Sequence, residues 1–364
     1  MIGARGFPRI QGGVERHCEE LYPRLAKKGY DITVFRRRPY VAPEASEREW
    51  RGVKFIDGRC PKIKGIEALY HSMVAGLIAV LKRPSLVHIH NIGPGLIIPL
   101  LRSTGLKVVV TYHSPNYEHD KWGPIGKMAL KLGEAMTLGL SNQVIFVSRL
   151  VKEKFSSKRE FRHIPNGVSM PSADVSAQPL NQWGLEKGRF LLAVGRLTPE
   201  KGFDLLIEAF KQLETDWKLV IVGSADHETD YSRAIEAAAK TDERIVLTGF
   251  LSGDALESVY RYAGCLVLPS RNEGMPLVLL EAFSHGIPTV TSDIPACIEL
   301  TEDKPFAKRF TSGDSAALRD ALREALADEA FLRSGPTAKT FVEQGYNWDK
   351  TAEETAAIYE EVLG

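Results

Sequence analysis

The sequence lacks several features that would assign it to particular classes of protein. Its nearest approach to a membrane-spanning segment is the uncharged apolar stretch 68–81, which is shorter than the ~20 residues that a bilayer requires. No secretory signal is recognisable. The four cysteines form no C-x-x-C pair, and the sequence contains neither a D-x-D motif nor a metal-ligand spacing. These absences favour a cytoplasmic protein with reduced thiols and argue against a metal enzyme.

A dinucleotide-binding G-x-G-x-x-G motif is also missing, since the chain begins its first turn with Gly3-Ala4-Arg5-Gly6-Phe7. That spacing argues against a dehydrogenase. The apolar stretch 68–81 has the basic flanks Lys62, Lys64, Lys82 and Arg83. We predict that it is a buried helix of the fold, and the alternative is a helix that lies on a membrane.

The composition is that of a globular enzyme with an uneven distribution of charge. The chain has 364 residues, 44% of them hydrophobic and 26% charged, which favours two domains. Residues 1–173 hold 28 Lys and Arg against 14 Asp and Glu, and residues 174–364 hold 19 against 32. The resulting net charges, +14 and −13, indicate either a surface that binds an anionic partner or two domains that attract each other.

Apolar runs alternate with helical stretches along the chain, in two series. The predicted strands are 32–35, 53–56, 86–90, 108–113 and 144–148, then 190–195, 218–222, 245–248, 265–269 and 289–291. Helices are predicted at 14–28, 66–83, 126–139, 315–328 and 348–363. The stretches 165–188, a predicted linker, and 305–313 interrupt the pattern. The alternation predicts an α/β protein with parallel sheets that helices cover on both faces.

One segment of the second series indicates a chemistry. The predicted strand 265–269 leads into a turn with Glu273, and a helix is predicted from Leu277. The helix N-terminus then lies at the carboxyl end of a strand, where backbone amides attract phosphate. Glu281, eight residues after Glu273, can accept two ribose hydroxyls. With Gly274, Met275 and Pro276, these residues suit a sugar joined to a nucleoside diphosphate.

Two other loops follow strands of the same series. Arg196 and Lys201, five residues apart, are placed to neutralise a pyrophosphate. Gly249 follows another predicted strand and is expected to line a base pocket through its backbone. The plain alternative is that Arg196, Lys201 and Glu281 are solvated surface charges.

The first series supplies glycines and a histidine. Gly12 and Gly13 open a predicted helix, where a ligand can approach the backbone closely. His113 ends a predicted strand on the ligand side of an open α/β sheet, although a structural histidine would show the same pattern. His88 and His90 alternate with apolar residues, and we expect them to be structural.

These motifs resemble, in order and spacing, those of the family 4 retaining glycosyltransferases. The resemblance covers nearly the whole chain and rests on Gly12-Gly13-Val14-Glu15, His113, Ser148, Pro165-Asn166-Gly167-Val168, Gly195-Arg196, Lys201-Gly202 and residues 269–282. It implies the GT-B fold, in which two Rossmann-like doubly wound domains face a central cleft. Residues 1–167 would be the acceptor-side domain, 168–345 the nucleotide-sugar domain, and 346–364 a helix that crosses back to the first domain.

The resemblance raises two structural expectations. The closing helix should bury a stripe formed by Trp348, Ala352, Thr355, Ile358, Tyr359 and Leu363. Relatives open with a longer first strand, whereas only Met1 and Ile2 precede Gly3 here. Because that strand is central in a doubly wound sheet, we expect a missing upstream stretch or apolar surface exposed on two neighbouring strands.

The resemblance predicts a hexosyltransferase that moves a sugar from a nucleoside diphosphate sugar to an acceptor hydroxyl with retention. No cofactor or metal ion is expected, because Arg196, Lys201 and backbone amides would meet the charge of the diphosphate. The predicted catalytic residues are His113, Arg196, Lys201 and Glu273. The alternatives are a sugar-nucleotide epimerase of the same architecture and a noncatalytic protein that binds anionic surfaces.

The expected acceptor is a glycan or a lipid-linked sugar of polysaccharide or glycolipid assembly, and no nucleic acid is expected as partner. Arg36, Arg37 and Arg38 would form a basic face with Lys62, Lys64, Lys82 and Arg83. Such a face would hold the protein peripherally on the anionic inner surface of a membrane.

Overall fold

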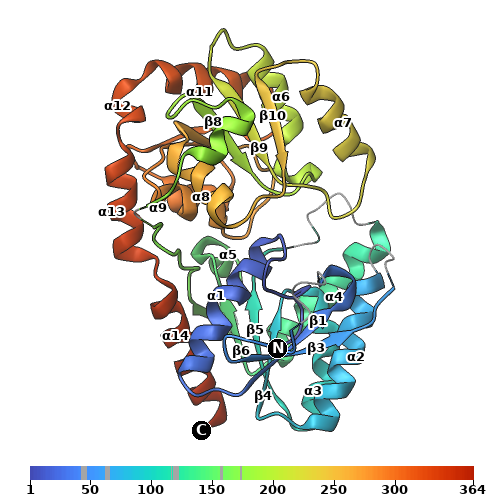
Figure 1. Cartoon of the computed structure of the whole chain (residues 1–364). Helices are drawn as coiled ribbons and strands as arrows, with labels where there is room; N and C mark the ends of the chain where they lie inside the picture. Colours follow the sequence, from blue (N-terminus) through green and yellow to red (C-terminus); the bar gives the residue numbers. More distant parts are fainter. Residues whose placement is uncertain (42–46, 62–65, 116, 118–122, 156–158, 173) are drawn as a thin grey trace. The chain divides into compact units, whose positions relative to one another are not determined.

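The computed structural model describes residues 1–41, 47–61, 66–115, 117, 123–155, 159–172 and 174–364. The chain forms two compact units (Figure 1). Unit 1 comprises Met1–Gly167 and Trp348–Gly364, and unit 2 comprises Val168–Asn347. None of the helices in the described ranges is long and apolar enough to cross a membrane.

Unit 1 has two groups of strands covered by helices, and all its strand pairs are parallel except that of β2 with β3, which is antiparallel. Its strands are β1 (Ile32–Arg37), β2 (Glu49–Trp50), β3 (Val53–Gly58), β4 (Leu86–His90), β5 (Lys107–Tyr112), β6 (Gln143–Phe146) and β7 (Arg162–His163). Its helices are α1 (Gly13–Lys27), α2 (Ile66–Lys82), α3 (Ile98–Ser103), α4 (Pro124–Leu140), α5 (Arg149–Glu153) and α14 (Trp348–Leu363), with 3-10 turns η1 (Arg38–Tyr40) and η3 (Gly93–Ile97). Successive side chains of β5 point to opposite faces of the sheet. Val109 packs in a core with α1 and α14, whereas Val108 and Val110 pack in a core with α2 and α3.

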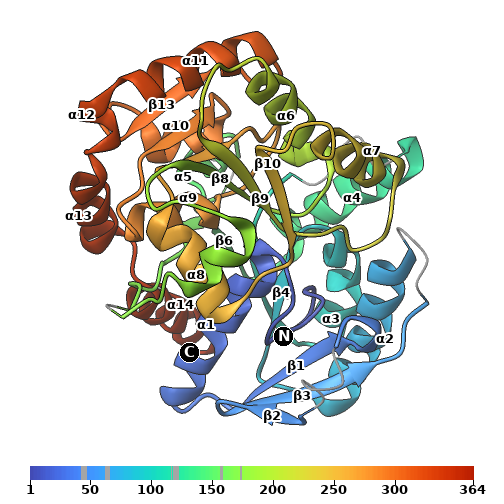
Figure 2. The same cartoon turned by 45° about the horizontal axis from the view of Figure 1, so that its top comes forward.

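Met1 and Ile2 join two groups of strands in unit 1. β1, β3 and β2 run along one edge (Figure 2), and β4 to β7 form the other group. Ile2 bridges Ile89 of β4 in parallel, and the Phe35 amide of β1 donates to the Met1 carbonyl at 3.1 Å. These two residues therefore occupy the central strand position. Ile2 and Ile89 are fully buried, so the predicted exposure of apolar surface is not found at Ile89.

Helix α14 packs on α1 and buries most of the predicted stripe. Trp348, Ala352, Thr355, Ile358 and Tyr359 are all buried. Leu363 is 43% exposed, so its predicted burial is wrong. The reason is that the helix ends at this residue, beyond the last residue of α14 that packs in the core.

Unit 2 repeats the architecture. Its strands are β8 (Phe190–Val194), β9 (Lys218–Val222), β10 (Ile245–Gly249), β11 (Cys265–Leu268), β12 (Thr289–Ser292) and β13 (Ala307–Phe310). Its helices are α6 (Phe203–Lys211), α7 (Asp230–Ala239), α8 (Gly253–Tyr262), α9 (Leu277–Ser284), α10 (Pro295–Thr301), α11 (Ser315–Ala327), α12 (Glu329–Leu332) and α13 (Gly335–Gly345), with 3-10 turns η5 (Gln178–Trp183) and η6 (Pro199–Lys201).

The strand order of unit 2 identifies where a ligand would bind. The sheet is wholly parallel, in the order β10-β9-β8-β11-β12-β13. This is the doubly wound order in which the chain direction across the sheet reverses between the first and the fourth strand. Ligands of such sheets bind outside the carboxyl ends of the strands at that reversal. In unit 2 the reversal lies between β8 and β11.

Two stretches that we predicted to be irregular are ordered parts of unit 2. The stretch 305–313 contains β13, an edge strand whose two adjacent charges, Lys308 and Arg309, conceal it in the sequence. The predicted linker 165–188 contains η5, and Leu180 in it is buried. The Tyr262 hydroxyl donates to the Val175 carbonyl at 2.8 Å. Residues 175–188 of this stretch therefore pack on unit 2.

Candidate functional site

The loops after β8 and β11 meet at the reversal point of the unit 2 sheet. Lys201, in η6, places its Nζ 2.6 Å from Oε1 of Glu273. The Ser270 hydroxyl donates to the same carboxylate oxygen at 2.8 Å. Two predicted site residues are thus in direct contact, although 72 positions separate them in the sequence.

Local backbone geometry holds these two loops together. Gly202 has a φ of 67°, and a Cβ at this position would lie 2.1 Å from the Pro269 carbonyl oxygen. Only glycine allows the approach. The Arg271 amide donates to the Glu200 carbonyl at 2.8 Å, and the Arg271 guanidinium forms an ion pair with Asp204 at 2.6 Å. The loops are therefore fixed by contacts that leave Lys201 and Glu273 at the strand ends.

Helix α9 begins beside this pair. Its N-cap is Pro276, and no side chain caps its first turn. Met275, Pro276 and Leu277 are buried and Gly274 is half-buried. The uncapped amides at the helix start attract an anion, and they carry the positive end of the helix dipole.

Glu281 lies one turn into α9 and is half-buried. The Tyr260 hydroxyl, from α8, donates to Oε2 of Glu281 at 2.9 Å. Tyr260 therefore orients the carboxylate and supplies a hydrogen bond, which a half-buried carboxylate requires. Glu281 is therefore not a fully solvated surface charge.

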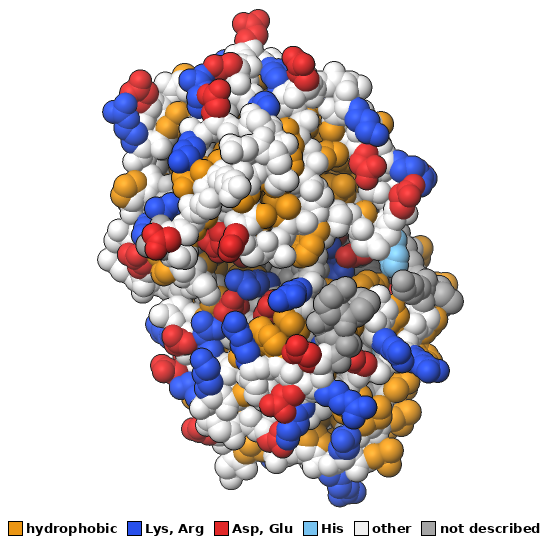
Figure 3. Space-filling model, in the orientation of Figure 1, with side chains coloured by type: hydrophobic (Ala, Val, Ile, Leu, Met, Phe, Trp, Pro, Cys, Tyr) orange, Lys and Arg blue, Asp and Glu red, His pale blue; other side chains and the backbone are white. Residues whose placement is uncertain are grey.

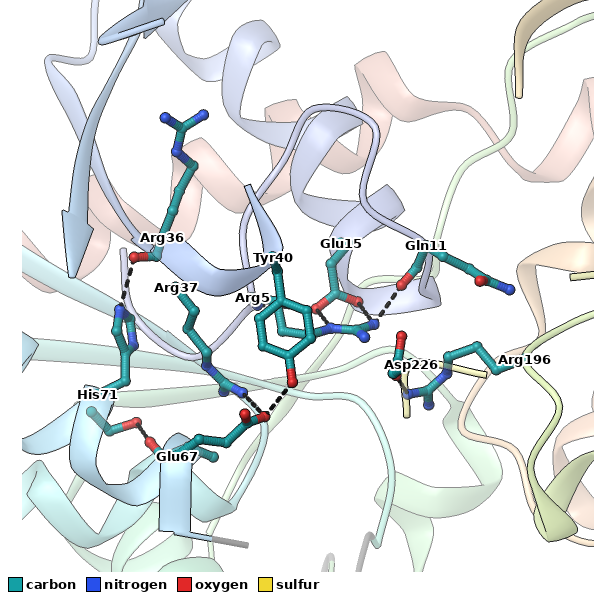
Figure 4. Close-up of polar contacts among 12 residues, drawn as sticks. Arg5, Gln11, Glu15, Arg36, Arg37, Tyr40, Glu67, His71, Arg196 and Asp226 are labelled. Carbon is teal, nitrogen blue, oxygen red and sulfur yellow. Dashed lines mark hydrogen bonds and ion pairs between the residues drawn. The ribbon is translucent and has the colours of Figure 1, made fainter. Parts of the chain in front are cut away.

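Arg196 lies in the same loop after β8 as Lys201, and Gly249 ends β10. The Arg196 guanidinium forms an ion pair with Asp226 at 2.9 Å (Figure 4). Gly249 ends β10 with a φ of 72°, and its carbonyl accepts from the Gly223 amide at 2.8 Å. Since β9 separates β10 from β8, Gly249 belongs to a neighbouring part of the strand ends, and no contact of the described residues joins it to Lys201 or Glu273.

In unit 1, the predicted glycine loop opens α1. Gly12 is the N-cap with a φ of 148°, and a Cβ there would lie 2.1 Å from Oε2 of Glu15. Glu15 in turn forms a buried ion pair with Arg5 at 3.2 Å, and Arg5 also donates to the Gln11 carbonyl (Figure 4). A Cβ on Gly13 would meet open space. The loop is therefore braced from within, and Gly13 faces outward.

His113 follows β5 and belongs to a cluster of buried histidines. Its Nε2 lies 2.9 Å from Nδ1 of His90, and Nε2 of His90 lies 2.6 Å from the Tyr22 hydroxyl. The His17 ring, on α1, stands edge-on to the His113 ring at 4.9 Å, and its Nδ1 lies 2.7 Å from the Asn166 amide oxygen. His90, which we expected to be only structural, thus contacts the predicted site residue His113 directly.

Burial keeps these histidines uncharged near neutral pH. It lowers the pKa of His17 to about 4, and burial together with the neighbouring rings lowers the pKa values of His90 and His113 well below their usual range. Ring nitrogens of the three residues lie within 4.8 Å of one another, a spacing that could hold a metal ion. The 2.9 Å separation of Nδ1 of His90 and Nε2 of His113 is also that of a hydrogen bond between neutral rings.

The predicted basic face of unit 1 is wrong in its main residues. Arg36 is 1% exposed, pairs with Asp57 at 2.7 Å, and stacks over Phe55. Arg37 is buried against Glu67 (Figure 4). Only Arg38 of the three is exposed. The carboxylate partners lie on other strands and helices, so the sequence alone could not reveal the burial. Lys62 and Lys64 lie outside the described residues.

Sequence reasoning missed the side chains that hold the site residues in place. They are Ser270 beside Glu273, Tyr260 beside Glu281, Asp226 beside Arg196, and His17 and Tyr22 in the histidine cluster. His17 offered a signal, because it lies one helical turn after the glycine pair. Ser270 lies within the motif 269–282 that carried the resemblance, whereas Tyr22, Asp226 and Tyr260 contact residues of other elements and carry no local pattern.

Comparison with known proteins identifies the family. The family model described as Glycosyl transferases group 1 matches residues 180–348, and the model described as Glycosyltransferase Family 4 matches residues 11–170. A GDP-mannose-dependent alpha-(1-6)-phosphatidylinositol monomannoside mannosyltransferase of Mycolicibacterium smegmatis is 24% identical over 90% of this chain and 89% of its own.

Solved structures agree on the fold. A sucrose-phosphate synthase from Thermosynechococcus elongatus has a TM-score of 0.83 and 23% identity, over 97% of this chain and 94% of its own. The Anabaena protein HepE, solved with UDP-glucose, has a TM-score of 0.80 and 16% identity over 98% of both chains. The fold is GT-B, and the chain belongs to the family 4, group 1 glycosyltransferases.

Proposed function

We propose that this glycosyltransferase moves a hexose from a nucleoside diphosphate sugar to an acceptor hydroxyl, with retention at the anomeric carbon and without a metal ion. The observation that carries the proposal is the contact between Lys201 and Glu273 at the reversal point of the unit 2 sheet, beside the start of α9. A cation, a carboxylate and an uncapped helix start suit a diphosphate bonded to a sugar. The UDP-glucose bound to the similar Anabaena protein supports a donor of this class.

In this proposal each residue of unit 2 has a separate task. Arg196 and Lys201 neutralise the diphosphate, and the amides at the start of α9 add further hydrogen bonds. Glu281, oriented by Tyr260, accepts the two ribose hydroxyls. Glu273 accepts hydrogen bonds from hydroxyls of the sugar. The incoming donor replaces part of the contact between Glu273 and Lys201.

Charge develops on the diphosphate as the bond to the sugar breaks. Preorganised donors at that position stabilise the transition state, and removal of one such donor costs about 10²–10³ in rate elsewhere. Because the carboxylates of the site already have binding tasks, we favour a front-face displacement over a covalent intermediate on a protein carboxylate. His113, neutral at pH 7, would donate or accept a hydrogen bond near the sugar.

We further propose a glycan or lipid-linked acceptor and a role in polysaccharide or glycolipid assembly at the inner face of a membrane. The acceptor in the name of the mycobacterial relative is a phosphatidylinositol monomannoside, which supports a lipid-linked sugar. Because this relative is 24% identical, we take from it the class of the acceptor and not the particular compound.

The proposal is tested by incubating the protein with UDP-, GDP- and ADP-sugars, each with and without a lipid-extract acceptor. We expect one donor to give acceptor-dependent release of its nucleoside diphosphate, with NMR of the product showing the anomeric configuration of the donor. An inverted product would contradict retention. Conversion of the donor into an epimer without acceptor would replace the transferase by an epimerase.

A further inference from the structure

Helices α2 and α4 of unit 1 turn large apolar side chains toward solvent. The side chains on α2 are Leu69, Tyr70, Met73, Leu77 and Leu81, and those on α4 are Ile125, Met128, Leu132 and Leu140. Their exposures run from 41% at Met73 to 82% at Leu81. These nine, here called the α2–α4 face, are among twelve exposed large hydrophobic residues in the described part of the chain, so such exposure is concentrated here.

The prediction that 68–81 is a buried helix is therefore wrong in part. The helix does bury one side, where His71, Ser72, Ala75 and Ala79 are covered. Its opposite side is also apolar and is exposed, as the values for Leu69, Leu77 and Leu81 show. The sequence could not separate the two sides, because a helix that is apolar all round has no periodicity that identifies the face toward the core.

The two helices belong to one surface. Both pack against η3: Gly76 of α2 lies against Ile97, and Gly95 lies so close to Gly133 of α4 that a Cβ would be 2.4 Å from the Gly133 carbonyl oxygen. Figures 1 and 2 both show α2, α3 and α4 on the same side of unit 1. The apolar side chains of both helices therefore lie on one side of the unit.

In the described ranges 66–115 and 123–140, the exposed charged side chains are all basic. Lys82, Arg83 and Lys131 are exposed and Lys127 is half-buried, and hydrophobic and basic side chains gather together over α2 in Figure 3. Within 66–115 and 123–140 the acidic residues are Glu67 and Glu134. Tyr40 donates to Glu67 at 2.7 Å and Tyr112 donates to Glu134 at 2.5 Å. The face is therefore apolar with a positive surround.

We propose that the α2–α4 face is the surface by which unit 1 lies on an anionic lipid bilayer. Its apolar side chains enter the boundary between headgroups and acyl chains, with Lys82, Arg83, Lys127 and Lys131 at the lipid phosphates. Tyr70 has the amphipathic ring that favours this interface. The proposal deepens the proposed function and rests on it in one respect, that the acceptor is a lipid-linked sugar.

A second copy of the chain fits this face less well. A two-fold interface places the same patch on both partners. The lysines and Arg83 of one copy would then face those of the other, and the two carboxylates of the region already accept tyrosine hydroxyls. A bilayer with anionic headgroups supplies the missing opposite charge.

The test is co-sedimentation of the whole protein with vesicles of phosphatidylcholine, with and without phosphatidylglycerol. We expect binding at low salt only when phosphatidylglycerol is present, and its loss by ~0.5 M salt. The double variant Leu77→Ser/Leu81→Ser should lower the partition coefficient by about tenfold or more. Lys82→Gln/Lys131→Gln should lower it about fivefold per charge.

Matched controls lie off the face. Leu363→Ser removes an exposed leucine and Lys240→Gln an exposed lysine, and both variants should bind vesicles like the wild type. Equal binding by Leu77→Ser/Leu81→Ser, or no wild-type binding to the phosphatidylglycerol vesicles at low salt, would overturn the proposal. A dimer in analytical ultracentrifugation that the same leucine variant dissociates would assign the face to a second copy and also overturn it.

A separate measurement keeps this proposal distinct from the proposed function. Thermal shift with nucleoside diphosphates, without vesicles, should give the same result for the wild type and the leucine variant. Vesicle binding without any nucleotide binding would reject the proposed function while the docking surface stands. Nucleotide binding without vesicle binding would reject the docking surface alone.

Discussion

The two units use basic side chains at strand ends in opposite ways. At the end of β1 in unit 1, the side chains of Arg36 and Arg37 are 1% and 9% exposed and are closed off by Asp57 and Glu67. After β8 in unit 2, the side chains of Arg196 and Lys201 are 29% and 17% exposed. Both pairs of cations have carboxylate partners. Only the second pair keeps a side open to a ligand.

The difference teaches that net charge alone does not define a binding surface. Residues 1–173 carry a net charge of +14, but Arg5, Arg36 and Arg37 within them are buried with carboxylates. These arginines brace the strand ends and the glycine loop of unit 1. Residues 174–364 carry a net charge of −13, yet Arg196 and Lys201 among them lie at the strand ends, where we propose that a diphosphate binds. The position of each charge decides its task.

The largest effect should come from opening a buried pair of unit 1. Arg36→Ala leaves Asp57 without its partner and removes donors to the Phe7 and Glu47 carbonyls. We expect the free energy of unfolding to fall by about 3 kcal/mol, the low end for a broken buried pair, because the side chain of Arg36 is buried whereas that of Asp57 is 30% exposed. Urea unfolding measures it. Arg38→Ala, the exposed neighbour, should change the value by no more than about 0.5 kcal/mol, and similar values for both variants would break the comparison.

Removing a cation of unit 2 should affect activity more than folding. Lys201→Ala should lower kcat/KM about a hundredfold, because a donor to developing charge on the diphosphate is lost. The melting temperature without ligand should fall less than that of Arg36→Ala, since Ser270 still donates to Glu273. Lys240→Ala, an exposed lysine on the same unit, is the matched control. Near-full activity of Lys201→Ala would mean that the site is assigned wrongly.

Acid should destabilise unit 1 before unit 2. Burial lowers the pKa of His17 and of His71 from 6.5 to about 4, so the unfolded chain binds protons more readily than the folded chain between these pH values. The stability that the neutral rings contribute is therefore complete above pH 6.5 and falls as the pH approaches 4, by about 1.4 kcal/mol per pH unit for each ring. Hydrogen exchange at pH 7 and pH 5 should show faster opening in unit 1 peptides. Equal acceleration in both units would contradict the difference.

The smallest effect should follow from chelation of metal ions. Arg196, Lys201 and the start of α9 are proposed to neutralise the diphosphate, so activity should be unchanged within about twofold in EDTA. Assays with EDTA, and with added Mg²⁺ or Mn²⁺ as control, measure this. A strict requirement for either ion would show that the cations of unit 2 do not suffice.

Much of the fold could be predicted from the sequence, because apolar runs alternate with helical stretches. The strands 86–90 and 218–222 were predicted with the bounds that the structure gives to β4 and β9. β13 was missed because Lys308 and Arg309 interrupt a short edge strand. The exposure of one side of α2 was not predicted, because the helix is apolar on every side.

The candidate site could be predicted from the sequence only where its residues form a local pattern. The helix start at Leu277 and the cations after β8 follow strands in the sequence, so their positions at strand ends could be predicted. The contact of Lys201 with Glu273 depends on the adjacency of β8 and β11 in the sheet. The burial of Arg36 and the contact of His90 with His113 depend on partners from other elements. Such pairings have no local signature.

The central claim is that the ends of β8 and β11 bind a nucleoside diphosphate, and a nucleotide titration tests it most directly. UDP, GDP and ADP are added to the wild type and to Lys201→Ala, and unfolding is followed by thermal shift. A ligand at a hundred times its Kd should add about 2.7 kcal/mol of stability. We expect such stabilisation of the wild type by at least one nucleotide and its loss in Lys201→Ala. Equal stabilisation of both proteins, or none of the wild type by any of the three, would contradict it.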